Sequence, residues 1–330
     1  MATVVRVGHS YDGPKWTVSQ MLKAPTRVPG MVVQSIKDNL IADLLLRQGP
    51  GAPGGAVQYQ EQVAFASARS AEIIAEFAEI PSTQSDMTMP VVAATQKRGL
   101  GLKISKEMET RNDVGRVAME MGIVKDQMIR AWNAVFFLSV YRSSMLTMST
   151  SRIATGGWMT DVVPSAGLTP TAGIRKDIAN AQYLMANQQI QGAIGNDRYG
   201  FVPDTMVVHP SLMPILLDSE EVNKVFMNSP ETDVSPRYTM RYPTKFGNLD
   251  IVQSWEILPN HALVLKRNTL GFISEEWPLS GSPMEYDQSK QTYSTYFTRR
   301  ALNAIDTPKS CVLINGVMSG NYSNTTTPVP

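Results

Sequence analysis

The residues best suited to chemistry in this chain are its three histidines. His9, His209 and His261 are far apart in the sequence and lie in unlike contexts, so they are not expected to form a zinc site or a nucleophile–histidine–acid triad. His209 ends an apolar run, which favours a structural role. His261 lies in a predicted turn and is expected to be exposed. The histidines therefore predict no catalytic centre.

Glycines and paired carboxylates give no stronger signal. Residues 195–200 have the spacing of a phosphate-binding loop, but Phe201 stands where that loop needs lysine. Residues 99–101 hold two glycines and lack the third of a dinucleotide fingerprint. Glu275 and Glu276 are adjacent, so on a strand they would point to opposite sides, and both are expected to be solvated. The sequence predicts a protein that is not an enzyme and holds no cofactor or metal.

Composition indicates a folded, nearly neutral protein. The chain has 330 residues, of which 43% are hydrophobic and 18% charged, and this excludes wholesale disorder. Thirty basic and 29 acidic residues leave a net charge of +1, which excludes a protein that binds nucleic acid through bulk positive charge. Cys311 is the single cysteine and is expected to be a buried free thiol in a strand. No apolar window is long enough to cross a membrane and no secretory signal is evident, so we expect a soluble protein from a reducing compartment.

The N-terminal segment is predicted to be an arm rather than a domain. Within residues 1–50 the one helical candidate is 32–47, which has a loose apolar stripe. Residues 49–55 contain two prolines among glycines, a composition that neither helix nor strand tolerates. We interpret that stretch as a hinge.

Residues 56–105 are predicted to form a long extended excursion. Residues 57–63 alternate with period two, as a half-buried strand does. Residues 72–80 fit a helix face and a strand face equally well, and local sequence does not decide between them. Residues 91–94 and 100–105 are predicted to be the returning strands.

Charge divides this excursion into an acidic and a basic part. Residues 61–86 hold five carboxylates against Arg69, a net charge of −4, and residues 97–106 hold four basic side chains, a net charge of +4. These charges either pair across strands and face solvent, where each pair contributes little, or they contact a neighbouring molecule. The candidate contact residues are Glu72, Glu76, Glu79, Lys97, Arg98 and Lys103.

The clearest element is a long helix predicted over residues 113–148. Asn112 or Asp113 would cap its N-terminus, and no proline interrupts it. Apolar residues recur at steps of three and four, and we expect them to be core packing. The expected core positions are Val117, Met121, Val124, Met128, Trp132 and Val135.

Helices and strands alternate in the second half of the chain. The predicted helices are 174–191 and 211–218, the second capped by Ser211, and the predicted strands are 205–209, 249–253, 262–266 and 311–314. Residues 284–306 are predicted to be a strand pair at a sheet edge, and residues 321–330 a polar tail. A monomer gains nothing from ordering an arm and an excursion, whereas a repeated assembly buries them, so we expect self-association.

Several segments, taken in order, resemble the major capsid proteins of tailed bacteriophages. They are residues 76–81, 99–108, 111–113 with the helix that follows, 201–210, 246–252, 271–274 and 306–310. The resemblance covers about residues 55–317 and is closest to the actinobacterial-phage branch. Each motif is weak alone, and their order and spacing carry the specificity.

The resemblance implies an α+β Hong Kong 97-like fold with an N-terminal arm, an extended β-hairpin loop, a peripheral domain with a long spine helix, and an axial α/β domain. The implied divisions are 1–54 (arm), 55–105 (loop), 106–155 (peripheral domain), 156–282 (axial domain), 283–304 (peripheral strands), 305–320 (return to the axial domain) and 321–330 (tail). In this family fold, residues 72–80 would be strand.

In function, the resemblance implies hexamers and pentamers that close a shell around double-stranded DNA in a virion assembled in the host cytoplasm. The implied partners are copies of the chain itself, scaffolding, portal and decoration proteins, and DNA in non-specific contact, with no membrane. A long charged N-terminal extension, present in some relatives, is missing, and no cross-linking Lys–Asn pair can be matched by motif. The alternatives are a bacterial nanocompartment that encloses cargo enzymes and, less favoured, a soluble α/β enzyme.

Overall fold

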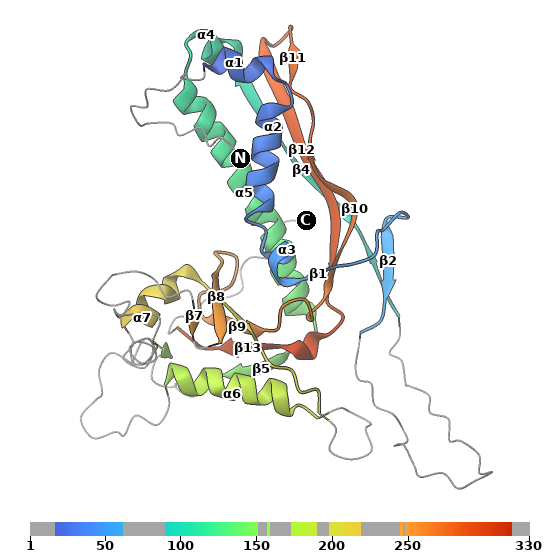
Figure 1. Ribbon diagram of the computed structural model, residues 1–330, viewed down its shortest axis with the longest axis vertical. Coiled ribbons are helices and arrows are strands. Elements are labelled where there is room, and N and C mark those ends of the chain that lie inside the picture. The colour runs from blue at the N-terminus through green and yellow to red at the C-terminus, as the bar shows by residue number, and fades with distance from the viewer. Residues whose placement is uncertain are drawn as a thin grey trace, which may run out of the picture.

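The computed structural model describes residues 17–61, 90–150, 157–158, 173–189, 198–218, 245–246 and 248–318. The described part of the chain is built around one long helix, a long five-stranded sheet and a separate six-stranded sheet. Figure 1 shows the long sheet and the helix running together toward the six-stranded sheet. No helix within the described ranges has the length and apolarity needed to span a bilayer.

The long helix α5 spans Val114–Arg142. Asp113 is its N-cap and accepts a hydrogen bond from the Arg116 amide at 3.1 Å, which confirms one of the two expected caps. The helix ends six residues before the predicted 148. Ser143 adopts an extended backbone, and both its amide and its hydroxyl donate to the Val140 carbonyl. Strand β5 (Leu146–Ser149) then begins, so periodicity alone overestimated the helix.

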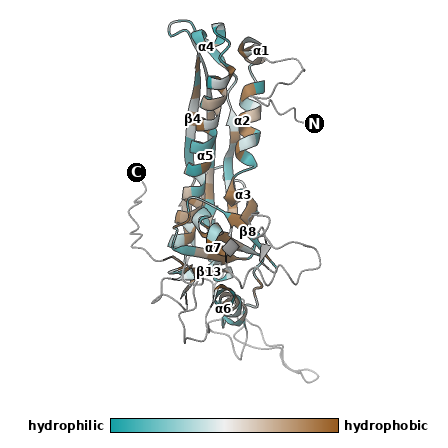
Figure 2. Ribbon diagram, turned by 90° about the vertical axis from the view of Figure 1, so that its left-hand side faces the viewer, coloured by the Kyte–Doolittle hydropathy of each residue, from teal (hydrophilic) through white to brown (hydrophobic). Residues whose placement is uncertain are grey.

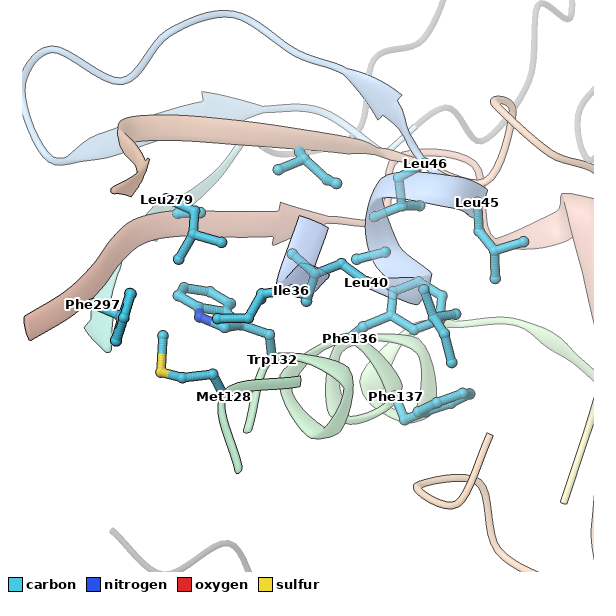
Figure 3. Packing of buried hydrophobic residues seen from close by; sticks show 14 of the residues in the cluster. Ile36, Leu40, Leu45, Leu46, Met128, Trp132, Phe136, Phe137, Leu279 and Phe297 are labelled. Atoms are coloured by element: carbon cyan, nitrogen blue, oxygen red, sulfur yellow. The ribbon is translucent and has the colours of Figure 1, made fainter. Parts of the chain in front are cut away.

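One face of α5 packs into the largest hydrophobic cluster. Figure 3 shows Trp132 beside Ile36, Leu279 and Phe297, which come from three other elements. Of the six expected core positions, Val117, Val124, Met128 and Trp132 are buried, and Met121 is partly buried against the cluster. Val135 is half-exposed because Phe136 and Phe137 occupy the inward positions at that turn.

The long sheet has the order β1-β10-β12-β11, with β4 also paired to β12. Its strands are β1 (Arg47–Gln48), β4 (Gln96–Ser105), β10 (Phe272–Gly281), β11 (Glu285–Asp287) and β12 (Thr292–Ala304). β11 and β12 confirm the strand pair predicted over 284–306. Its expected place at a sheet edge is wrong, because β12 pairs with β10 and β11 along one side and with β4 along the other. With thirteen residues, β12 is long enough to pair with β10 and then β11 along one edge and with β4 along the other.

The N-terminal segment is packed onto the body, which corrects the expected arm for residues 17–48. Instead of one helix over 32–47, the chain forms α1 (Val18–Lys23), α2 (Arg27–Lys37) and α3 (Ile41–Leu45). Figures 1 and 2 show α2 running alongside α5, and hydrophobic residues gather on α3. The apolar stripe of these helices, including Ile36 and Leu45, is buried in the same cluster as α5. The segment is not a free arm because its apolar side chains are buried in the core of the same subunit.

Residues 49–55 contain neither helix nor strand, as predicted, but they do not form a free hinge. The Gly49 and Ala52 amides donate to carbonyls of β10, at 2.7 Å to Ile273 and 3.4 Å to Glu275. A Cβ on Gly49 would come 2.2 Å from a ring carbon of Phe272, so this close approach needs glycine. The segment therefore covers one edge of the long sheet.

A two-stranded ribbon, β2 (Ala56–Tyr59) and β3 (Val91–Ala94), leads into and out of residues 62–89. β2 is shorter than the strand predicted over 57–63, and β3 confirms the strand at 91–94. The ambiguous residues 72–80 lie outside the described residues.

The six-stranded sheet has the order β5-β13-β9-β6-β8-β7. Its remaining strands are β6 (Thr205–Val208), β7 (Lys245–Phe246), β8 (Leu249–Gln253), β9 (His261–Leu265) and β13 (Cys311–Asn315), and helices α6 (Ile174–Asn187) and α7 (Met213–Asp218) accompany it. A 3-10 turn, η3 (Pro210–Leu212), precedes α7, and another, η4 (Pro308–Ser310), precedes β13. The N-cap of η3 is His209, so the predicted Ser211 cap is wrong. β10 lies in the long sheet, so the chain leaves the six-stranded sheet before the boundary implied at 282.

Candidate inter-subunit surface

Within the described residues, helices pack against one face of the long sheet. Phe297, Arg299 and Ala301 of β12 are buried on the side where α2 and α5 pack. The alternate residues of β12 face the other way, which we call the outer face. Antiparallel partners share a face, so the outer face includes the cross-strand pairs Lys97–Arg300, Gly99–Thr298, Gly101–Tyr296 and Lys103–Ser294.

Trp277 is fixed in place on the outer face. Its side chain is 48% exposed, the Lys97 ammonium lies 5.0 Å from its ring centroid, and the Arg300 guanidinium lies 5.9 Å from it. Both cations interact favourably with the π face of the indole. An exposed tryptophan held between two basic side chains is suited to an apolar partner that also carries negative charge.

The two glycines of residues 99–101 are packing positions rather than part of a nucleotide loop. A Cβ on Gly101 would come 2.9 Å from Tyr296 Cδ1, so the tyrosine ring leans across the position that a side chain would fill. A Cβ on Gly99 would come 2.7 Å from the Phe297 carbonyl oxygen. The pair leaves the middle of β4 without side chains on the outer face.

The candidate contact residues do not all share this face. Lys97 and Lys103 are exposed on the outer face, whereas Arg98 faces the helix side, half-buried and 3.4 Å from the Gln96 amide oxygen. Alternation along β4 divides the basic stretch between two faces, which the sequence count of +4 concealed. Glu72, Glu76 and Glu79 lie outside the described residues.

Glu276 anchors the base of the β2–β3 ribbon to the long sheet. Its carboxylate accepts from Arg300 Nη1 at 2.9 Å and from the Thr95 hydroxyl at 2.8 Å. The Thr95 amide donates to the Gly55 carbonyl at 2.8 Å, and Gly55 has the left-handed φ of +72° that favours glycine. These hydrogen bonds fix the base of the β2–β3 ribbon against the long sheet.

Glu275 and Glu276 point to opposite sides of β10, as predicted, but the expectation that both are merely solvated is wrong. Glu275 pairs with Arg299 at 2.6 Å on the helix side, and Glu276 pairs with Arg300 at 2.9 Å on the outer side. Arg299 is 3% exposed, also pairs with Asp43 of α3 at 2.7 Å, and lies 5.3 Å from the Trp132 ring centroid. The sequence contains a pair of adjacent glutamates and a pair of adjacent arginines, but their pairing across two strands was not predicted.

Burial shifts two ionisable groups near the ribbon base. The pKa of Tyr59 is raised by burial and by the nearby Glu61 and Asp306 carboxylates. Burial raises the pKa of Asp306, and the ion pair with Arg47 partly offsets this. The same Arg47–Asp306 pair ties β1 to the end of the long sheet.

Two of the three histidines and the cysteine contact other groups of the subunit, and His9 lies outside the described residues. His209 Nδ1 accepts from the Ser211 amide at 3.2 Å, and His261 is half-buried, with its Nδ1 3.1 Å from the Tyr141 hydroxyl, which corrects the expected exposure. Cys311 is buried in β13 as expected, and burial raises the pKa of its thiol. Among the described residues, no three His, Cys, Asp or Glu side chains lie close enough together to hold a metal.

The comparisons with known proteins identify the class. A family model described as phage capsid protein matches residues 88–292, more than half of the chain. The chain belongs to this phage capsid protein family, and its fold is the α+β Hong Kong 97-like capsid fold. It is a structural protein of a capsid shell that associates with itself, and its place is the virion.

Solved structures of similar fold come from phages and from a virus-like particle. A structure from Microbacterium phage Oxtober96 matches with a TM-score of 0.53 and 10% identity over 84% of this chain and 90% of that one. The capsid of the cyanophage P-SCSP1u matches at 0.52 and 12% identity over 82% and 86%. A virus-like particle from Pyrococcus furiosus matches at 0.52 and 9% identity over 88% and 98%. A search of the curated proteins finds no match.

Proposed function

We propose that this chain is the major capsid protein of a tailed phage. Its copies assemble as hexamers and pentamers into an icosahedral shell that encloses double-stranded DNA. The observation that carries the proposal is the phage capsid family match over residues 88–292, together with the fold. In this assignment the spine helix α5 and the long sheet form the peripheral domain, and the six-stranded sheet forms the axial domain. Residues 55–105 form the extended loop, whose returning strand β4 runs into the long sheet.

The surfaces of the described residues support association with further copies. Residues 17–48 contribute to the hydrophobic core of their own subunit, so they are not the main exposed apolar surface that a neighbouring copy could bury. The ribbon and the outer face are different: Val92 is 67% exposed, and Trp277 and Tyr296 are both about half exposed. A two-stranded ribbon with exposed valines is marginal alone and gains stability from a neighbouring molecule.

The shell would hold its genome without a basic lining. A net charge of +1 suits contacts with DNA that are weak and independent of base sequence, in a container filled by a packaging motor. Scaffolding, portal and decoration proteins are the further partners of this proposal, and assembly takes place in the host cytoplasm.

The test is electron microscopy of the expressed chain and of native particles. We expect round, closed shells tens of nanometres wide, and nuclease-protected double-stranded DNA in the native ones. A second candidate is a nanocompartment that encloses protein cargo, which the likeness to the Pyrococcus furiosus particle favours. Native shells that contain enzymes and no protected DNA would select that candidate, and a small soluble oligomer would exclude both.

The charge division of the excursion gives a separate prediction. We propose that Lys97, Arg98 and Lys103 contact Glu72, Glu76 and Glu79 of a neighbouring subunit. Replacing Lys97 and Arg98 by glutamate should reduce the yield of particles at least about tenfold, because each reversal sets like charges against each other across a contact. The subunit should stay folded, since both side chains lie on an edge strand and neither is fully buried.

The yield is measured by sedimentation and folding by circular dichroism. Arg116→Glu with Lys125→Glu makes the same change in net charge on α5 and serves as the control. Lys97 also contacts the Trp277 ring, so Lys97→Met, which removes the charge without reversing it, separates loss of that contact from repulsion. Normal particle yield from the double reversal would remove the proposed contact.

A further inference from the structure

The two edges of the long sheet differ. On the β1–β10 side, the backbone amides of Arg47, Gly49 and Ala52 donate hydrogen bonds to the carbonyls of Gly271, Ile273 and Glu275, so the chain itself covers that edge as far as Glu275. On the opposite side, β4 pairs only with β12, and no strand among the described residues pairs with its other edge. Ten residues of strand are thus left with one open side.

The hydrogen-bond pattern identifies which backbone groups are open. In an antiparallel ladder, alternate residues bond to one neighbour and the residues between them point away. Lys106 donates to Gln291, so the even-numbered residues of β4 bond toward β12, whereas Thr95 donates away from β12, to Gly55. Tyr296, opposite Gly101, exchanges hydrogen bonds with Ser282 on the far side of β12, which agrees with this assignment.

The open amides and carbonyls therefore belong to Lys97, Gly99, Gly101 and Lys103. These are the residues whose side chains lie on the outer face, and the central two have no side chain at all. A backbone that approaches this edge meets no side chain from Gly99 or Gly101. Lys103 lies at one end of the open stretch, and Lys97, whose ammonium contacts the Trp277 ring across β12, lies at the other. Leu100 is 38% exposed between the two glycines and offers an apolar contact.

We propose that the open edge of β4 accepts an extended strand from a second copy of this chain, which lengthens the long sheet across the subunit boundary. The edge is basic, with three cations and no carboxylate over residues 96–105, and residues 61–86 of the same sequence have a net charge of −4. A second copy therefore brings the complementary charge. Strand addition supplies affinity through main-chain hydrogen bonds, and the flanking lysines select an acidic strand. The proposal rests on the proposed shell function.

Hydrogen exchange of the backbone amides tests this inference without any substitution. In the free subunit, the amides of Lys97, Gly99, Gly101 and Lys103 should exchange rapidly, and those of Leu100 and Leu102, bonded to β12, slowly. In assembled shells of the pure chain, the four open amides should slow by more than about 100-fold. Mass spectrometry with residue-level fragmentation reads both sets, and the bonded amides are the internal control.

The outcomes separate this inference from the shell function. Shells that form, and in which the four amides exchange as fast as in the free subunit, would overturn strand addition and leave the function standing; the lysines would then protect the edge against pairing. Protection in native virions but not in shells of the pure chain would assign the edge to another virion protein and would equally overturn it. Absence of shells would count against the proposed function instead.

Discussion

Replacing Trp132 by alanine should destabilise the subunit by about 3–5 kcal/mol, the usual cost of removing a large aromatic side chain from a packed core. The indole is 2% exposed and lies where α5, α2 and the long sheet meet. Its removal leaves a cavity among three elements and takes away the ring on which Arg299 lies. Equilibrium urea unfolding of the full-length chain, kept below the concentration at which it assembles, measures the loss.

Trp255→Ala is the matched control for this substitution. Trp255 is 70% exposed, so the same change of residue type should alter the free energy of unfolding by less than about 0.5 kcal/mol. Equal losses in the two variants would mean that α5 does not present Trp132 to the core. Aspartate is a poorer replacement at position 132, because its carboxylate would find a partner in Arg299.

Replacing Arg299 by methionine should have the second large effect. The side chain is 3% exposed and bridges Asp43 of α3 and Glu275 of β10. Methionine fills much of the same volume but leaves two partly buried carboxylates side by side without a cation, at a cost of about 3 kcal/mol. Because Asp43 belongs to the N-terminal segment, that segment should also become more sensitive to limited proteolysis.

Arg300→Met is the control, one residue along the same strand. Arg300 is 33% exposed and pairs with Glu276 on the outer face, where an ion pair contributes about 1 kcal/mol or less. If the Arg299 variant unfolds at the same urea concentration as the Arg300 variant, the buried network does not hold the N-terminal segment. Restored stability in a triple variant, Arg299→Met with Asp43→Asn and Glu275→Gln, would locate the cost in the unpaired carboxylates.

Local sequence signals predicted the elements whose stability comes from one strong periodic face. The core of α5, its cap at Asp113 and strands such as β8 follow from patterns within about 30 residues. The resemblance predicted the family and fold that the family match shows, because the order and spacing of several weak motifs are read along the whole chain. Element ends were less predictable: α5 ends at Arg142 because Ser143 bonds back to Val140, which periodicity does not encode.

Features that depend on distant contacts were missed. The N-terminal helices were interpreted as an arm because their composition gives no sign that α5 would cover their apolar stripe. Arg299 and Arg300 are adjacent in the sequence, yet the pleat of β12 buries one and leaves the other partly exposed. The basic stretch at residues 97–103 was predicted as one group, and the same pleat divides it between two faces.

The sequence by itself determined the class of protein, the spine helix, the absence of any recognisable catalytic motif and the uneven charge of residues 61–106. Only the tertiary structure decided that β12 is central, that residues 17–48 are part of the core, and that one edge of β4 has no partner strand among the described residues. The physical reason is that composition and periodicity are local properties of the chain. Which edge of a sheet is covered, and which of two adjacent arginines is buried, depends on partners more than 200 residues away, such as Asp43 for Arg299.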